Sequence, residues 1–451
     1  MPRESRTGRA GRRELLAAGA GGVVESFDWT VYAVLAPYFA ARIFPAENAD
    51  LALIGAYAGF AVGFAARPLG GWALGRIADR AGRRHALVVA VLIASAASLA
   101  LALCPTHAAA GLLAPAVAVT ARAAQGFSLG GETPSAAAYL VETAPPDRRY
   151  RYGALGYAGV VLGTLLSFGV LAALLAVLGR AGVEAGGWRL GFAAAALLGL
   201  AALWIRRGAP EAPGFEAPGF DGRVPVAARS GARGALRPAV PRMGVVLLLV
   251  LGVTVGYYLG ALYLPRHAAA GGGADPGDPR TALVMLPALL ALAATMVGAG
   301  WAADRWGPVP VLRIGLGALA LVTVPVALGA ADGRLPLGPA AALHLAVLGL
   351  SFGPITVYCA RLFPPAIRGV AVGVPFAVAT GAFGGTFPLL AEALRAAGAA
   401  GAVPWAAAGA ALLSLAATAL PGAVPDDGAG IIERVERPGT SGPVAGGTEV
   451  S

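Results

Sequence analysis

Five charged side chains interrupt the long apolar runs of this sequence: Glu25, Asp28, Arg67, Arg122 and Glu132. A charge at the centre of a membrane span costs about 2.5 to 3.5 kcal/mol on insertion scales, so these residues cannot all face lipid. They must face one another or water. Because an arginine can bind an organic anion and a carboxylate can carry a proton, the combination predicts a polar site for both.

Helical spacing groups several polar residues into two stripes. The stripes are Glu25, Asp28 and Tyr32 in the first apolar run, and Arg122, Gln125 and Ser128 in the fourth. A polar cavity between the two runs is the simplest arrangement. The alternative is that the charges only pair to hold helices together, and Arg67 and Glu132 fit that structural role best.

In the second half of the chain, Tyr257 and Tyr258 lie in the middle of an apolar run and are candidates for solute contact. Tyrosines at the ends of spans are instead ordinary interfacial anchors. The histidines show no spacing typical of a metal site, and the sequence predicts no cofactor.

The composition predicts an all-α membrane protein with many spans. Of 451 residues, 57% are apolar and 13% are charged, about half the charged fraction of soluble domains. This deficit excludes an ordinary cytosolic enzyme. Apolar windows bounded by charges or by Gly and Pro predict twelve helices, at 15–39, 51–75, 86–105, 113–141, 152–178, 189–205, 244–265, 281–302, 309–330, 339–360, 368–392 and 402–421.

The distribution of basic residues predicts the orientation. All 34 basic residues are arginines, and most fall on one side if loops are counted alternately from a cytoplasmic N-terminus. We therefore expect a cell (inner) membrane protein with both termini cytoplasmic, whose net charge of +10 reflects contact with the lipid bilayer and not with nucleic acid. The expected parts are a cytoplasmic segment 1–14, a six-helix bundle 15–205, a cytoplasmic linker 206–243, a second bundle 244–421 and a disordered tail 422–451.

A short motif occurs twice, once in each half of the chain. After the second span the sequence reads Gly75-Arg-Ile-Ala-Asp79-Arg80-Ala-Gly82-Arg83, and after the eighth it reads Gly300-Trp-Ala-Ala-Asp304-Arg305-Trp-Gly307. Such repetition indicates two homologous six-helix bundles. The chain thus resembles the major facilitator superfamily, which implies that these residues gate the protein. The resemblance implies that Asp79 lies against the start of the eleventh span and Asp304 against the start of the fifth.

Four further segments narrow the resemblance. They are Val24–Tyr32, Gly63–Gly71, Arg122–Glu132 and Gly187–Phe192. Together they look like the metabolite:proton symporter family, which takes up dicarboxylates, tricarboxylates, shikimate and betaines. The sequence departs from that family at Arg361, where a glutamate is usual, and at Val374 and Pro375, which replace a tyrosine and an asparagine.

These observations predict a secondary transporter that uses alternating access to take up a small organic anion or zwitterion with a proton. Arg122 would bind a carboxylate, Asp28 or Glu132 would carry the proton, and Arg122 would pair with Asp28 when no solute is bound. A proton-driven exporter is the alternative, and a non-transporting membrane sensor is a further one. An enzyme is disfavoured, because no long loop carries a cluster of acids, histidines or metal ligands.

Overall fold

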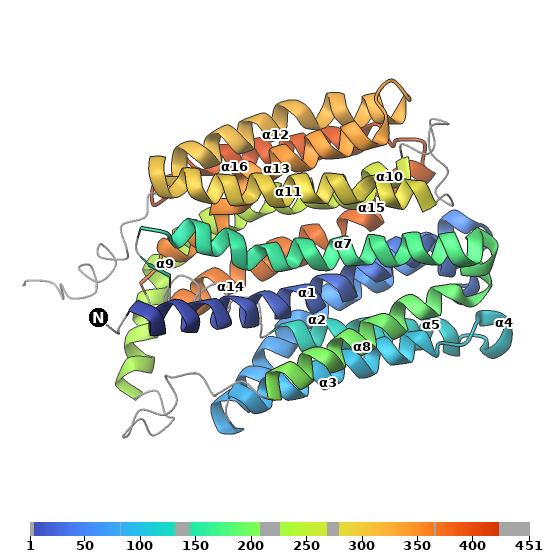
Figure 1. Ribbon diagram of the computed structural model, residues 1–451, viewed down its shortest axis with the longest axis horizontal. Coiled ribbons are helices and arrows are strands. Elements are labelled where there is room, and N and C mark those ends of the chain that lie inside the picture. The colour runs from blue at the N-terminus through green and yellow to red at the C-terminus, as the bar shows by residue number, and fades with distance from the viewer. Residues whose placement is uncertain are drawn as a thin grey trace, which may run out of the picture.

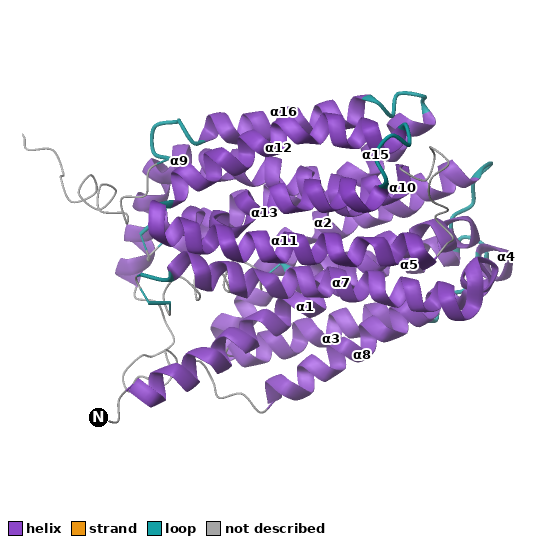
Figure 2. Cartoon of the chain, turned by 45° about the horizontal axis from the view of Figure 1, so that its top comes forward, coloured by secondary structure: helices purple, strands orange, loops and turns teal. Residues whose placement is uncertain are grey.

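The computed structural model describes residues 4–81, 83–130, 144–145, 147–207, 226–267, 279–364 and 367–423. Every regular element in these ranges is a helix, and short loops join most of them (Figure 2). The first half contains α1 (Glu4–Ile43), α2 (Ala49–Ala81), α3 (Arg83–Ala102), α4 (His107–Ala110), α5 (Leu113–Leu129), α7 (Arg149–Gly182), the π-turn η1 (Val183–Gly187) and α8 (Trp188–Arg207). The second half contains α9 (Val226–Tyr258), η2 (Leu259–Tyr263), α10 (Leu264–His267), α11 (Pro279–Trp306), α12 (Pro308–Ala331), α13 (Leu337–Arg361), α14 (Arg368–Ala379), η3 (Thr380–Gly384), α15 (Phe387–Ala396) and α16 (Ala402–Ala417).

These helices supply twelve membrane spans. Seven stretches of the described residues are long and apolar enough to cross a bilayer, and one of them, Arg149–Ala201, contains both α7 and most of α8. Two shorter apolar helices, Val88–Ala102 and Ala402–Ala417, and the charge-bearing α1 and α5 complete the set. A helix suits this environment because it satisfies its backbone hydrogen bonds within one segment.

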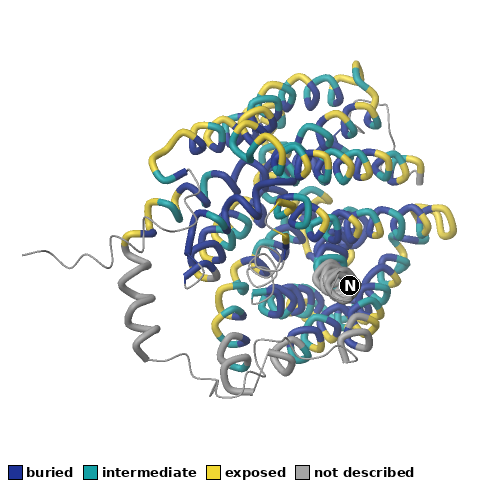
Figure 3. The backbone as a smooth tube through the Cα atoms, turned by 60° about the vertical axis from the view of Figure 1, so that its left-hand side comes forward, coloured by how far each residue is buried: buried dark blue, intermediate teal, exposed yellow. Residues whose placement is uncertain are grey.

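The spans form two bundles, one from each half of the chain (Figure 1). The helices up to α8, coloured blue to green, make one bundle, and those from α9 onward, coloured yellow-green to red, make the other. Seen from the end of the molecule, buried positions line the interior and exposed positions face outward (Figure 3). Large apolar side chains such as Leu112, Ile314 and Leu321 are exposed on that outer surface, as expected where lipid replaces water.

Most predicted span boundaries agree with the helices to within a few residues, but two helices begin well before the predicted spans. The predicted linker 206–243 is helical from Val226, so α9 continues through Pro238 and Pro241, and α1 begins at Glu4 inside the predicted N-terminal segment. Hydropathy marks only the apolar part of a helix, whereas alanine and arginine have high helix propensity and extend it. The predicted end of the fourth span, residues 208–225 of the linker and the tail from 424 lie outside the described residues.

Close backbone contact between α2 and α5 positions the candidate site. A Cβ atom added to Gly126 would lie 1.7 Å from the backbone oxygen of Gly63, so only glycine fits there. A Cβ at Gly63 would lie 2.7 Å from the ring of Trp29. Small residues of this kind let membrane helices approach closely. The contact therefore holds α2 and α5 together beside Trp29 of α1.

Candidate transport site

A buried polar core joins α1, α3 and α5. Ser98 donates a hydrogen bond of 2.6 Å from Oγ to Oδ1 of Asp28, and the amide nitrogen of Gln125 donates one of 2.9 Å to the same oxygen. Gln125 also lies 2.9 Å from the Ser98 hydroxyl. All three side chains are buried. Asp28 is thus held by two donors from two neighbouring helices.

Arg122 lies next to this core and is completely buried. One terminal nitrogen donates a hydrogen bond of 2.6 Å to Oε1 of Gln125. Its guanidinium carbon lies 4.0 Å from the ring centroid of Trp29, 4.4 Å from that of Tyr32 and 5.0 Å from that of Phe60. Its Nε and its other terminal nitrogen have no acceptor among the described residues. The charge is therefore stabilised by aromatic faces and by one amide, and two donors stay available.

The prediction of a direct ion pair between Asp28 and Arg122 was wrong. Among the described residues no ion pair joins them, and Gln125 stands between them, because its amide donates to the carboxylate and accepts from the guanidinium. Gln125 lies one helical turn after Arg122 and can reach both partners at once. The two charges are linked through this one side chain.

A second charged pair lies beside the first. A terminal nitrogen of Arg67 on α2 lies 3.8 Å from a carboxylate oxygen of Glu25 on α1. The guanidinium carbon of Arg67 is 4.6 Å from the ring centroid of Trp29 and 4.2 Å from that of Phe64. Arg67, which is partly buried, and Trp29 thus belong to the same cluster as Arg122.

The tyrosines of the site lie on both sides of the junction between the bundles. Tyr32 belongs to the first bundle, where its hydroxyl donates to the backbone oxygen of Ala56 at 2.9 Å. Tyr257 of the second bundle shares a short hydrogen bond with Thr164 of α7. The ring of Tyr258 packs edge-on against Phe60, with centroids 6.3 Å apart. The second bundle therefore reaches the site through this pair of tyrosines.

Asp304 of the repeated motif ties the two bundles together at one end of the molecule. Its Oδ1 accepts a hydrogen bond of 2.9 Å from the backbone nitrogen of Tyr150, and its Oδ2 accepts one of 3.1 Å from that of Arg151. The Arg151 side chain adds a contact of 3.2 Å. These nitrogens begin α7, where backbone donors lack helical partners and the helix dipole attracts negative charge. The contact expected for Asp304 is the one observed.

The structure describes fewer contacts for the other residues of the repeated motif. Arg305 is exposed and its guanidinium lies 5.8 Å from the ring centroid of Trp301. Gly75, Asp79 and Arg80 belong to α2, and Arg83 belongs to α3. The structure describes the backbone of these four residues but not the contacts of their side chains. Gly82 and Glu132 lie outside the described residues altogether.

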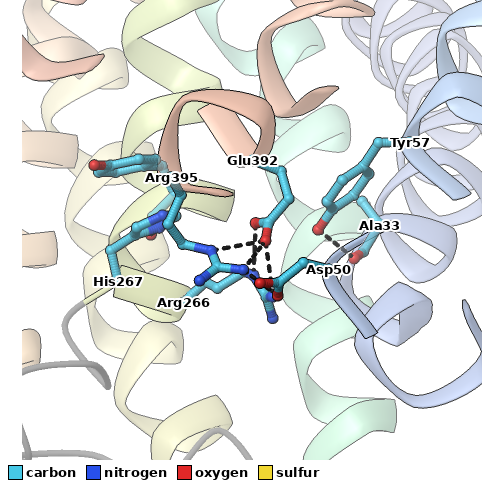
Figure 4. A network of polar contacts seen from close by, with 8 residues as sticks. Ala33, Asp50, Tyr57, Arg266, His267, Glu392 and Arg395 are labelled. Atoms are coloured by element: carbon cyan, nitrogen blue, oxygen red, sulfur yellow. Dashed lines mark hydrogen bonds and ion pairs between the residues drawn. The ribbon is translucent and has the colours of Figure 1, made fainter. Parts of the chain in front are cut away.

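A second charged cluster ties the bundles together at the opposite end (Figure 4). We define the Asp50 cluster as Asp50, Arg266, Glu392 and Arg395. Arg266 makes a bidentate contact with Glu392, at 3.0 and 3.2 Å, and Arg395 donates to Glu392 at 2.7 Å. Arg395 also pairs closely with Asp50 in the first turn of α2. The cluster therefore joins the first bundle to α10 and α15 of the second.

The sequence model described as the Major Facilitator Superfamily matches residues 18–388, which is most of the chain. The chain belongs to this superfamily. It is a multi-pass membrane transporter and not an enzyme.

Three similar proteins illustrate the relationship. The chain is 29% identical over 395 residues to the alpha-ketoglutarate permease of Escherichia coli, covering 85% of this chain and 87% of that protein. It is 30% identical over 393 residues to a putative proline/betaine transporter of Staphylococcus haemolyticus, covering 85% and 81%. The structure of the proton:xylose symporter XylE with 6-bromo-6-deoxy-D-glucose has a TM-score of 0.72 at 19% identity and covers 90% of this chain and 94% of that one. This last likeness establishes the fold.

For this superfamily member, the structure brings together most of the site residues predicted from the sequence. Glu25, Asp28, Tyr32, Arg122 and Gln125 cluster between α1, α2 and α5. Ser128 instead donates to the backbone oxygen of its own helix. The sequence reasoning missed Ser98, Trp29 and the central position of Arg67. For Arg67 a signal existed, because an arginine inside an apolar span needs a buried partner.

Proposed function

We propose that this transporter takes up a small organic anion or zwitterion together with a proton, by alternating access. The observation that carries this proposal is the fully buried Arg122, whose guanidinium keeps two donors without an acceptor among the described residues. A buried cation with spare donors is suited to bind a carboxylate in bidentate fashion. Both named relatives, an alpha-ketoglutarate permease and a proline/betaine transporter, have carboxylate-bearing compounds in their names.

The link through Gln125 supplies a route for proton coupling. Asp28 receives hydrogen bonds from Ser98 and Gln125, and Gln125 in turn accepts one from Arg122. A solute carboxylate that neutralises Arg122 leaves Asp28 as an uncompensated buried charge. A proton on Asp28 removes that charge, because an isolated ion is costly in a low-dielectric interior. Solute and proton would then be bound together.

Alternating access would use the two inter-bundle contacts. Asp304 holds α11 against α7 at one end, and the Asp50 cluster holds α2 against α10 and α15 at the other. Opening either end requires that the contacts there break, as in a two-state equilibrium biased by differential contacts. We place Gly75, Asp79, Arg80, Gly82, Arg83 and Arg305 in the same gating role at the Asp304 end, which we assign to the cytoplasm of an inner membrane.

Solute-driven proton uptake into proteoliposomes tests the function. In a panel of organic acids and betaines, at least one solute should acidify the lumen of liposomes that contain the wild-type protein. Asp28→Asn should lose accumulation against a gradient but retain counterflow, because the amide resembles a protonated carboxyl group. Arg122→Gln should lose solute binding. Asp332→Asn, a change at an exposed aspartate, is the matched control.

The same assay separates import from export. Proton movement opposite to solute movement would establish the exporter and refute symport. Solute-driven proton uptake by Asp28→Asn at the wild-type rate would move the proton site elsewhere, and Glu132 would be the next residue to change.

A further inference from the structure

A hydrogen bond between two hydroxyl groups joins the bundles midway along α7. Tyr257 of α9, in the second bundle, contacts Thr164 of α7, in the first. Thr164 comes fourteen residues after Tyr150, where Asp304 contacts the start of α7, so it lies about 21 Å farther along the helix. The Asp50 cluster joins the bundles at the opposite end. The hydroxyl pair therefore links the bundles between their two charged contacts.

The contacts of Thr164 show which hydroxyl group donates this bond. Thr164 donates its single hydroxyl hydrogen to the backbone oxygen of Val160, one helical turn earlier, at 3.2 Å. Its oxygen lies 2.9 Å from Oγ of Ser26 and also contacts the Tyr257 hydroxyl, whereas Thr30 is farther away at 3.5 Å. A hydroxyl group supplies one donor and two acceptor lone pairs. Because its hydrogen is used within α7, Thr164 accepts from Ser26 and Tyr257, and Tyr257 is the donor between the bundles.

The second bundle holds Tyr257 in place. Tyr257 lies in the last turn of α9, just before the π-turn η2, and the backbone oxygen of the preceding Gly256 is 2.9 Å from Nε2 of His344 on α13. Its ring packs against Phe352, also on α13, with centroids 6.0 Å apart. Such π-turns inside helices are frequent at functional sites. A rotation of the bundles that separates α9 from α7 must therefore break the bond to Thr164.

Aromatic rings connect Tyr257 to the site at Arg122. The ring of Tyr257 packs edge-on against that of Tyr258, with centroids 5.7 Å apart. Tyr258 packs edge-on against Phe60 at 6.3 Å. The guanidinium carbon of Arg122 lies 5.0 Å from the Phe60 ring centroid. A solute bound at Arg122 would therefore lie next to the junction that Tyr257 spans.

We propose that Tyr257 and Thr164 form a latch between the bundles, and that the solute releases it by offering an acceptor oxygen to the Tyr257 hydroxyl. This inference rests on the proposed function and adds the residues that couple solute binding to bundle movement. The Tyr257 hydroxyl has one hydrogen and cannot donate to Thr164 and to the solute at once. The latch is formed when the site is empty and broken when it is filled. Such a differential contact is what a ligand needs to shift a conformational equilibrium.

The latch predicts opposite roles for its two hydroxyl groups in solute binding. Hydrogen bonds to an ionised acceptor are roughly twice as strong as those between neutral groups, so a solute carboxylate oxygen is a better acceptor for Tyr257 than Thr164 is. Thr164 competes with the solute for this donor and acts as a positioning residue. Removing the Thr164 hydroxyl should therefore strengthen binding, and removing the Tyr257 hydroxyl should weaken it. A bond that only holds helices together would not give opposite signs.

Calorimetry on the purified full-length protein tests these signs with three probes that carry carboxylate oxygens: succinate, proline and glycine betaine. For each probe that the wild-type protein binds, Thr164→Val should raise the affinity about two- to tenfold, because the latch no longer has to be broken. Tyr257→Phe should lower the affinity by a similar factor, since this is about the net contribution of one hydrogen bond. If Thr164→Val does not fold, Thr164→Ala removes the same acceptor and should change the affinity in the same direction.

Three control variants separate the latch from packing. Thr164→Ser keeps the hydroxyl group and should bind each probe as the wild type does. Ser26→Ala removes the other bond to Thr164, which stays within the first bundle, and should leave the affinities unchanged. Thr323→Val removes a buried hydroxyl that donates to the backbone oxygen of Leu319 in its own helix, and should also be neutral.

The inference is overturned if removal of the two hydroxyl groups does not change the affinity in opposite directions, or if Ser26→Ala raises it as much as Thr164→Val. Binding of none of the probes by the wild type also overturns it. Solute-driven proton uptake in liposomes then separates the two levels of proposal. If an organic acid or betaine drives proton uptake although the binding test fails, the proposed function stands without the latch. If none does, both fail.

Discussion

On the proposed gating role of Asp304, removing its charge should open the end of the transporter at which it joins the two bundles. The side chain is only 4% exposed and accepts three hydrogen bonds, two from backbone nitrogens at the start of α7 and one from Arg151. Bonds to a charged group contribute about 1.5 to 3 kcal/mol in favourable cases, and a charge at a helix N-terminus about 0.3 to 2 kcal/mol. Because Asn keeps one neutral acceptor, Asp304→Asn should cost the closed state about 1 to 2 kcal/mol, which corresponds to roughly a tenfold change in the equilibrium.

Two spin labels, one at the start of α7 and one at the end of α11, measure this change in the equilibrium. Arg148 precedes α7 and Trp306 ends α11, and both side chains are exposed, so cysteines there accept labels without disturbing the core. Cys104 and Cys359 are buried and should be replaced by alanine in every variant. The distance distribution between the labels should shift toward longer values in Asp304→Asn.

The matched control is Asp332→Asn, which removes an exposed aspartate at the far end of α12 and should leave the distribution unchanged. A distribution in Asp304→Asn identical to that of the wild type, with normal solute flux, would refute the reasoning that this contact holds the end closed. A shift of equal size in the control would show that the label pair reports general loosening and not this contact.

Three further outcomes are expected. Gln125→Leu should retain solute binding but lose solute-driven proton uptake, because it removes the side chain that donates to Asp28 and accepts from Arg122; coupled uptake at the wild-type rate would contradict this. Gly126→Ala should lower the thermal midpoint and the yield of folded protein, because its Cβ would lie 1.7 Å from a backbone oxygen, whereas Gly169→Ala, with no atom within 4 Å, should be neutral. Reporter fusions at residues 222 and 428 should be cytoplasmic and one at residue 272 external, and an external reporter at 222 would overturn the orientation.

The sequence by itself determined the spans and their division into two halves. Lipid leaves only helices as a solution for long apolar segments, so hydropathy alone predicts where they lie. The recurrence of Asp79 as Asp304 indicated the repeat, and the resemblance to the major facilitator superfamily implied that Asp304 lies against the start of the fifth span, where backbone donors are unpaired. The high cost of a charge within a span singled out Asp28 and Arg122.

Tertiary structure decided which of these side chains meet. The rotation of each helix and its distance from the next depend on contacts such as that between Gly63 and Gly126, and these cannot be read from the periodicity of one segment. For this reason the sequence predicted a direct pair of Asp28 and Arg122, where Gln125 lies between them. It also did not reveal that Arg67 and Arg122 lie against the same ring of Trp29. The Asp50 cluster went unnoticed because charges at helix ends are ordinary in sequence, and only packing distinguishes a solvated charge from one that joins two bundles.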